Sequence, residues 1–200
     1  LANETGGSEA IQRQRYAFAA TFSAGLLMPI GYEFGFKEGL DVIFTSPRQW
    51  ERPNFDISQF IRRVNLLKLQ HPLLQGEGSL KSLTKRESNI LVLERVSERA
   101  PGKVGWILMN RACDGAASFA LDGLTHLNPN HRLYRICRDD SLRDGELLSD
   151  GTLTLDSAEV ALVMEQREVK EEDKSDSVSH SSRNKDFSTQ LREGLGFSLP

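Results

Sequence analysis

The chain has 200 residues, of which 38% are hydrophobic and 26% are charged, so it can form one large domain or two small ones with a packed core. Its formal net charge of -3 argues against a basic surface for nucleic acid. The longest apolar stretch, residues 17–30, is too short and too often interrupted to cross a bilayer, so no membrane partner is expected.

Residues 1–75 predict a helix, a strand, a loop and a second helix. Ser8 is placed to cap the first helix, in which Ile11, Phe18 and Phe22 recur near one face. Residues 26–30 then form an apolar run without alternation that ends in Pro and Gly, as in a strand buried on both faces. We therefore interpret this segment as part of an α/β layer rather than a complete fold.

The second helix of this segment is predicted from a capping signal and an apolar stripe. Asp56 and Gln59 have the spacing of a capping box. The apolar positions that follow at helical spacing, and that end before Pro72, are Ile57, Phe60, Ile61, Val64 and Leu67.

Residues 76–166 predict an antiparallel β-sandwich. Short runs rich in Val, Ile and Leu alternate with turn signals such as Asp114-Gly115 and Asp150-Gly151. The predicted strands are residues 89–96, 103–111, 116–121, 132–138, 152–155 and 159–164. Because such a sandwich keeps its strand partners within itself, we expect residues 76–166 to fold alone.

Residues 167–200 are rich in charge and serine, with few apolar residues to offset the entropy of ordering, which predicts a disordered tail. The chain starts at Leu1 rather than Met, so we expect a fragment or a processed product. Cys113 and Cys137 form no metal-binding spacing, which is typical of semi-buried thiols in a cytoplasmic protein.

Four features in order resemble glycoside hydrolase family 13, the α-amylase superfamily, over residues 8–166. They are the buried run 26–30, the turn Gly31-Tyr32-Glu33, the helix end His71-Pro72-Leu73-Leu74 and the following all-β segment. The resemblance implies that residues 1–75 are the last strand and helices of a (β/α)8 barrel, and that residues 76–166 are the C-terminal β-sandwich domain. The resemblance also implies a partner for this chain, namely the N-terminal segment of the barrel, which this sequence lacks.

Within the family, Pro47-Arg48-Gln49-Trp50 resembles a motif of the maltose-1-phosphate maltosyltransferases. That subfamily has a sugar-contacting Lys-Tyr pair where this chain has Val42-Ile43, so those contacts are not carried over. The substrate-binding residues that we predict are Tyr32, Glu33 and Trp50, from the loops at the sugar-binding end of the barrel. For each of them a packing or positioning role is the alternative.

The carboxylates that would do the chemistry are missing from this sequence. Retaining glycosidases use two carboxyl groups about 5 Å apart, and the family's Gly-x-Arg-x-Asp and His-Asp motifs do not occur here. Asp139 and Asp140 lie outside the barrel segment, in the predicted sandwich. We therefore predict no activity for this chain alone, within a parent enzyme that hydrolyses or transfers α-1,4-linked glucan units.

The family usually needs no organic cofactor, and no cluster of acidic calcium ligands is evident. The alternative interpretation is a non-catalytic module that binds carbohydrate or another protein.

Overall fold

The computed structural model describes residues 6–39, 41, 43–112, 114–137, 145–148 and 151–166. Within these residues the helices come first and the strands follow. The helices are α1 (Glu9–Phe22), α2 (Ser58–Gln70) and α3 (Pro72–Gln75). The strands are β1 (Leu80–Ser82), β2 (Ile90–Arg95), β3 (Gly105–Asn110), β4 (Ala117–Ala120), β5 (His131–Arg135), β6 (Glu146–Leu147), β7 (Thr152–Leu155) and β8 (Val160–Glu165). The predicted tail 167–200 lies outside the described residues.

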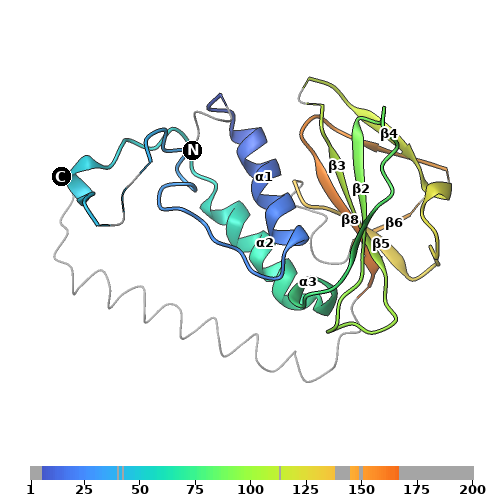
Figure 1. Ribbon diagram of the computed structural model, residues 1–200. Coiled ribbons are helices and arrows are strands. Elements are labelled where there is room, and N and C mark those ends of the chain that lie inside the picture. The colour runs from blue at the N-terminus through green and yellow to red at the C-terminus, as the bar shows by residue number, and fades with distance from the viewer. Residues whose placement is uncertain are drawn as a thin grey trace. The chain divides into compact units, whose positions relative to one another are not determined.

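The strands form two antiparallel sheets (Figure 1). The larger has the order β1-β2-β3-β8-β5-β6, and the smaller pairs β4 with β7. All six strands predicted for residues 76–166 are present, because their apolar runs lie between strong turn signals. The sequence analysis missed β1 and β6, which are only three and two residues long and largely exposed, and so have no apolar pattern.

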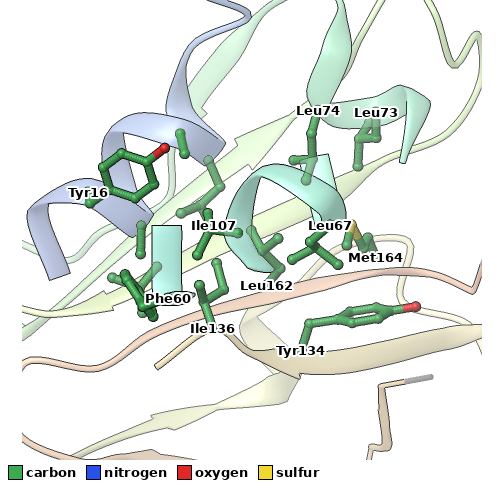
Figure 2. Packing of buried hydrophobic residues seen from close by; sticks show 14 of the residues in the cluster. Tyr16, Phe60, Leu67, Leu73, Leu74, Ile107, Tyr134, Ile136, Leu162 and Met164 are labelled. Atoms are coloured by element: carbon green, nitrogen blue, oxygen red, sulfur yellow. The ribbon is translucent and has the colours of Figure 1, made fainter. Parts of the chain in front are cut away.

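The large sheet is buried on both faces. Ile107 of β3 points toward the helices, while its neighbours Trp106 and Leu108 point toward the small sheet. Figure 2 shows the helix side, where α1, α2 and α3 cover the sheet and Phe60 and Leu67 of α2 lie in the same cluster as Ile107. Residues 1–166 accordingly form one compact unit. The helices thus complete the core of the sheet domain.

Helix α2 buries the predicted stripe, but it begins in a different way from the prediction. Phe60, Val64 and Leu67 are each at most 2% exposed. The capping box does not form: the helix starts at Ser58 after Ile57, which makes no side-chain cap. Asp56 instead accepts a hydrogen bond from the Ser58 amide at 2.8 Å, which satisfies one of the free N–H groups of the first turn.

Helix α1 begins at the predicted cap, since the Ser8 hydroxyl accepts a hydrogen bond from the Ile11 amide. Its buried face differs from the prediction, because Phe22 is 41% exposed and Ile11 and Phe18 are half-buried. The buried positions are Gln12, Gln14, Tyr16, Ala17, Ala20 and Thr21. The two glutamines are buried because each donates to a backbone carbonyl on another element.

The predicted strand at residues 26–30 is wrong. These residues form neither a strand nor a helix, and Leu27 is 94% exposed. A single apolar segment becomes a strand only beside partners that bond its backbone on both sides. The strands of this unit pair with one another in the two sheets, and none of the described strands pairs with residues 26–30. The described residues also contain no helix that is long and apolar enough to span a membrane.

Two basic side chains, Arg95 and Lys68, connect the end of α1 to the rest of the unit through hydrogen bonds. Arg95 of β2 donates to the carbonyls of Phe22, Leu73 and Gly76 at 2.7–2.9 Å. The Lys68 ammonium of α2 donates to the carbonyls of Ala20 and Ser23. Burial, and secondarily the charge of Arg95, lowers the pKa of Lys68. Both cations satisfy carbonyls at a helix C-terminus, where positive charge is favourable.

Candidate functional site

The first two predicted site residues lie in a tight turn after the exposed segment 26–30. The amides of Phe34 and Phe36 both donate to the Gly31 carbonyl, at 3.2 and 3.1 Å. Gly31 has φ +82°, and a Cβ there would lie 2.2 Å from the ring of Phe36. Glycine at this position therefore allows the turn to close around Phe36.

Tyr32 points inward and holds this turn on α1. Its hydroxyl donates to the Gln12 backbone carbonyl at 2.8 Å, and the side-chain amide of Gln12 donates back to the Tyr32 carbonyl at 2.8 Å. Its ring lies 6.1 Å from the ring of Tyr16. Burial raises the pKa of Tyr32 to about 12. This geometry matches the packing alternative given for Tyr32.

Glu33 combines a structural bond with an unsatisfied group. Its carbonyl accepts the Ile57 amide at 2.9 Å, which fixes the chain where α2 begins. Its side chain is half-buried, and the buried Oε2 atom has no hydrogen-bond partner among the described residues. A buried carboxylate oxygen normally has a partner, so Glu33 leaves an unsatisfied acceptor at this turn.

Trp50 follows the short 3₁₀ helix η2 (Pro47–Gln49) and is 52% exposed. The three predicted site residues therefore lie in different environments: Tyr32 is packed inward, Glu33 is half-buried and Trp50 is exposed to solvent. Val42 stands at one position of the Lys-Tyr pair that contacts sugar in the maltosyltransferases, and it lies outside the described residues. Asp139 and Asp140 also lie outside them.

A small apolar pocket of about 190 Å³ lies between α1 and the segment 26–29. Tyr16 and Tyr32 line it, and Arg15 is the charged residue of its lining. The other lining residues are Ala19, Leu26, Leu27, Met28 and Pro29. Sequence analysis missed this pocket because it interpreted residues 26–30 as a fully buried strand.

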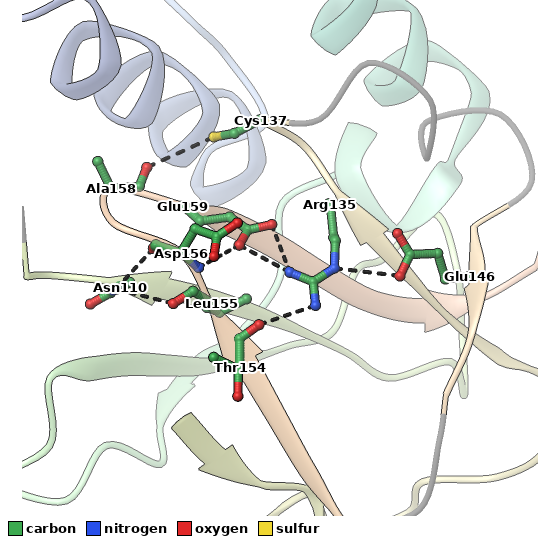
Figure 3. Close-up of polar contacts among 9 residues, drawn as sticks. All are labelled: Asn110, Arg135, Cys137, Glu146, Thr154, Leu155, Asp156, Ala158 and Glu159. Atoms are coloured by element: carbon green, nitrogen blue, oxygen red, sulfur yellow. Dashed lines mark hydrogen bonds and ion pairs between the residues drawn. The ribbon is translucent and has the colours of Figure 1, made fainter. Parts of the chain in front are cut away.

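A cluster of polar residues links the two sheets (Figure 3). Arg135 of β5 donates to both carboxylate oxygens of Glu159 at 2.9 and 3.0 Å and to the Thr154 carbonyl of β7 at 3.1 Å. Asn110 of β3 donates to the carbonyls of Gly115, Leu155 and Asp156. The fold itself supplies the partners of these buried groups, so this cluster is structural.

The histidines have similarly structural roles. Both ring nitrogens of buried His131 have backbone partners, the Asn128 amide at 3.2 Å and the Val104 carbonyl at 3.1 Å. His71 packs edge-on against Tyr134 at 5.2 Å. Within the described ranges, no three His, Cys, Asp or Glu side chains come together as metal ligands.

Comparison with solved structures reveals a shared fold. An α-amylase from Geobacillus thermoleovorans, complexed with acarbose, matches 81% of this chain at 18% identity with a TM-score of 0.52. A γ-CGTase from alkalophilic Bacillus clarkii also matches 81% at 18% identity and a TM-score of 0.52. A maltogenic α-amylase from Thermotoga neapolitana matches 80% at 15% identity and a TM-score of 0.52.

This chain has the fold of a part of α-amylases. It spans 35%, 24% and 37% of the lengths of those three structures, so it corresponds to less than half of each. No protein-family model matches the sequence, and no curated protein matches it.

Proposed function

We propose that this chain is the C-terminal part of an α-glucan-active enzyme of glycoside hydrolase family 13. The end of the barrel would lie in residues 1–75 and the β-sandwich domain in residues 76–166. The likeness to part of two α-amylases and a γ-CGTase supports this assignment. The missing N-terminal barrel segment would be supplied by further polypeptide.

The observation that carries the proposal is the exposed segment 26–30. Leu26, Leu27, Met28 and Ile30 are 37–94% exposed. In a complete enzyme, further polypeptide would cover this segment and bury these side chains. Such a contiguous exposed apolar surface indicates a contact with another protein element.

The catalytic carboxylates would then belong to the missing barrel segment. There, two carboxyl groups about 5 Å apart would act as nucleophile and as acid/base in a double displacement. This chain would contribute Glu33, whose unsatisfied Oε2 can accept a bond from a sugar hydroxyl or a catalytic side chain, and Trp50 as a sugar contact. Tyr32 would hold their turn in place.

The finer assignment is transfer from maltose-1-phosphate in a cytoplasmic enzyme. It is supported by the sequence Pro47-Arg48-Gln49-Trp50 and by the low cysteine content.

The test begins with the gene sequence upstream of Leu1, followed by assays of this chain and of the longer product on starch, glycogen and maltose-1-phosphate. We expect turnover only from the longer protein. There, Glu33→Gln should lower kcat/KM by about 10-fold or more, as for a lost charged contact, while the exposed control Glu38→Gln should not. Repurified chain that still turns over substrate would refute the proposal.

A second candidate is a protein-interaction module without chemistry, which the exposure of Leu27 also favours. A start Met directly before Leu1 would support it over the enzyme fragment.

A further inference from the structure

The walls of the apolar pocket beside α1 are held in place by hydrogen bonds. Tyr32 is fixed against α1 by its two bonds with Gln12, and the Tyr32 amide donates to the Pro29 carbonyl at 3.2 Å. On the helix, the Tyr16 hydroxyl donates to the Asn65 side chain of α2 at 2.8 Å. A pocket whose walls are already fixed loses little conformational entropy when it is filled.

The chemistry of the lining favours an apolar occupant. The hydroxyls of Tyr16 and Tyr32 already donate within the unit, and Pro29 has no N–H group to offer. A sugar, or any other ligand rich in hydroxyls, would lose its hydration here and find few partners. An aliphatic or aromatic group has no such cost.

The size of the pocket fits one side chain. Its volume of about 190 Å³ lies below the range of about 300–1,000 Å³ that is usual for small-molecule sites. A cavity of about 150 Å³ holds a benzene ring in another protein, so a leucine or phenylalanine side chain fits here. Leu27, which lines the pocket, and the nearby Ile30 are also exposed. A free ligand of this size would leave them exposed, whereas a polypeptide can cover them and fill the pocket together.

The pocket also carries one positive charge. Arg15 is exposed and belongs to the lining, and no acidic side chain occurs among the described residues that line the pocket. Burial raises the pKa of Tyr32 and the charge of Arg15 opposes this rise, so the guanidinium lies close enough to act on the pocket wall. Because a guanidinium has several N–H donors, Arg15 can pair with a carboxylate and keep its contacts within the unit.

We propose that the polypeptide that covers residues 26–30 inserts one leucine-sized or phenylalanine-sized side chain into this pocket and places a carboxylate beside it, on Arg15. That this polypeptide belongs to the same longer protein rests on the proposed function. The apolar anchor and its acidic neighbour are what the pocket adds. A covalently joined segment meets the pocket at a high effective concentration, so one such anchor is enough to hold it.

A small mimic of the anchor tests the pocket in the full 200-residue chain. The probe is 3-phenylpropionate, which has a benzyl group and a carboxylate. The chain has three methionines, of which Met28 lines the pocket and Met164 is buried in the core between helices and sheet. The probe should shift the Met28 methyl signal in NMR spectra with a Kd of about 1 mM, as for a small fragment, and leave Met164 unchanged.

A neutral probe and two variants separate the apolar contact from the charge. The amide 3-phenylpropionamide should bind the parent chain about 3-fold more weakly, the effect of one exposed ion pair. In Arg15→Gln the two probes should bind equally. Ala19→Phe should abolish the Met28 shift by filling the pocket, while Ala10→Phe, exposed on the same helix and outside the lining, should bind as the parent does. Arg15 is exposed, so Arg15→Gln keeps the test decisive even if Ala19→Phe does not fold.

The longer protein tests the occupant. Its own polypeptide should fill the pocket, so the Met28 methyl should not respond to a probe concentration that shifts it in the 200-residue chain. A response there would overturn the inference and indicate a separate protein as the occupant. So would a Met28 methyl that does not respond in the 200-residue chain, that responds equally in Ala19→Phe, or that distinguishes the two probes as strongly in Arg15→Gln as in the parent.

These outcomes are separable from those of the proposed function. An active longer protein with an open pocket would reject the anchor and leave the proposed function standing. An inactive longer protein with a closed pocket would reject the proposed function and leave the anchor standing. A gene that starts directly before Leu1 would reject both.

Discussion

Replacing Arg95 with methionine tests how the helices are fastened to the sheet. Arg95 is 2% exposed and its guanidinium donates to three carbonyls, those of Phe22, Leu73 and Gly76. These carbonyls belong to the end of α1, to α3 and to the start of the following loop. One side chain of β2 therefore holds the ends of two helices.

The expected cost follows from these three acceptors. Methionine fills part of the space but leaves the three carbonyls buried without a hydrogen-bond donor. Each unsatisfied carbonyl lowers the free energy of unfolding by about 1–3 kcal/mol. Burial lowers the pKa of Arg95 because the charged guanidinium loses hydration in the folded protein. Removing this buried charge therefore offsets part of the destabilisation. We expect a net loss of about 3–6 kcal/mol, a large part of a typical domain stability of about 5–15 kcal/mol.

Thermal unfolding followed by circular dichroism measures this loss. At about 2–4 °C per kcal/mol for a chain of this size, Tm should fall by at least about 6 °C. Arg99→Met is the matched control, because Arg99 is exposed on the neighbouring turn, and its Tm should stay within about 2 °C of the parent. An Arg95→Met protein as stable as this control would refute the reasoning.

Three other predictions follow from the turn and from the helix–sheet core. Gly31→Ala should lower Tm by several degrees, because its Cβ would clash with Phe36 at a positive φ; an unchanged Tm would mean that the turn can open freely. The pKa of Tyr32 is raised to about 12, so the stabilisation from its neutral hydroxyl is complete below about pH 10 and is lost between about pH 10 and 12. In Tyr32→Phe, Tm should therefore fall less steeply over this alkaline range than in the parent chain. An equally steep fall in both proteins would contradict this. Residues 76–166 expressed alone should aggregate, which reverses the expectation from sequence, because the helix-facing side of the large sheet would lose its cover; a soluble monomer with a cooperative transition would contradict this.

The sequence by itself determined the elements whose signals are local. The six longer strands were predicted because apolar runs such as that of β7 are bounded by turn residues, and the stripe of α2 was predicted from helical spacing. The order of motifs indicated the amylase resemblance, and this chain shares its fold with part of a solved α-amylase. Asp41 and Thr45 also carried the local signal of a side-chain-stabilised turn, which the sequence analysis did not use.

Only the tertiary structure decided what each element packs against. Gln12 and Gln14 are buried on α1, in preference to Phe22, because distant carbonyls of Tyr32 and Asn110 satisfy them. The apolar run at residues 26–30 is exposed because none of the strands in the described part of the chain pairs with it. Burial and backbone pairing depend on residues that lie far away in the chain. An apolar pattern in the sequence indicates only that a segment needs a packing partner, and not which element supplies it.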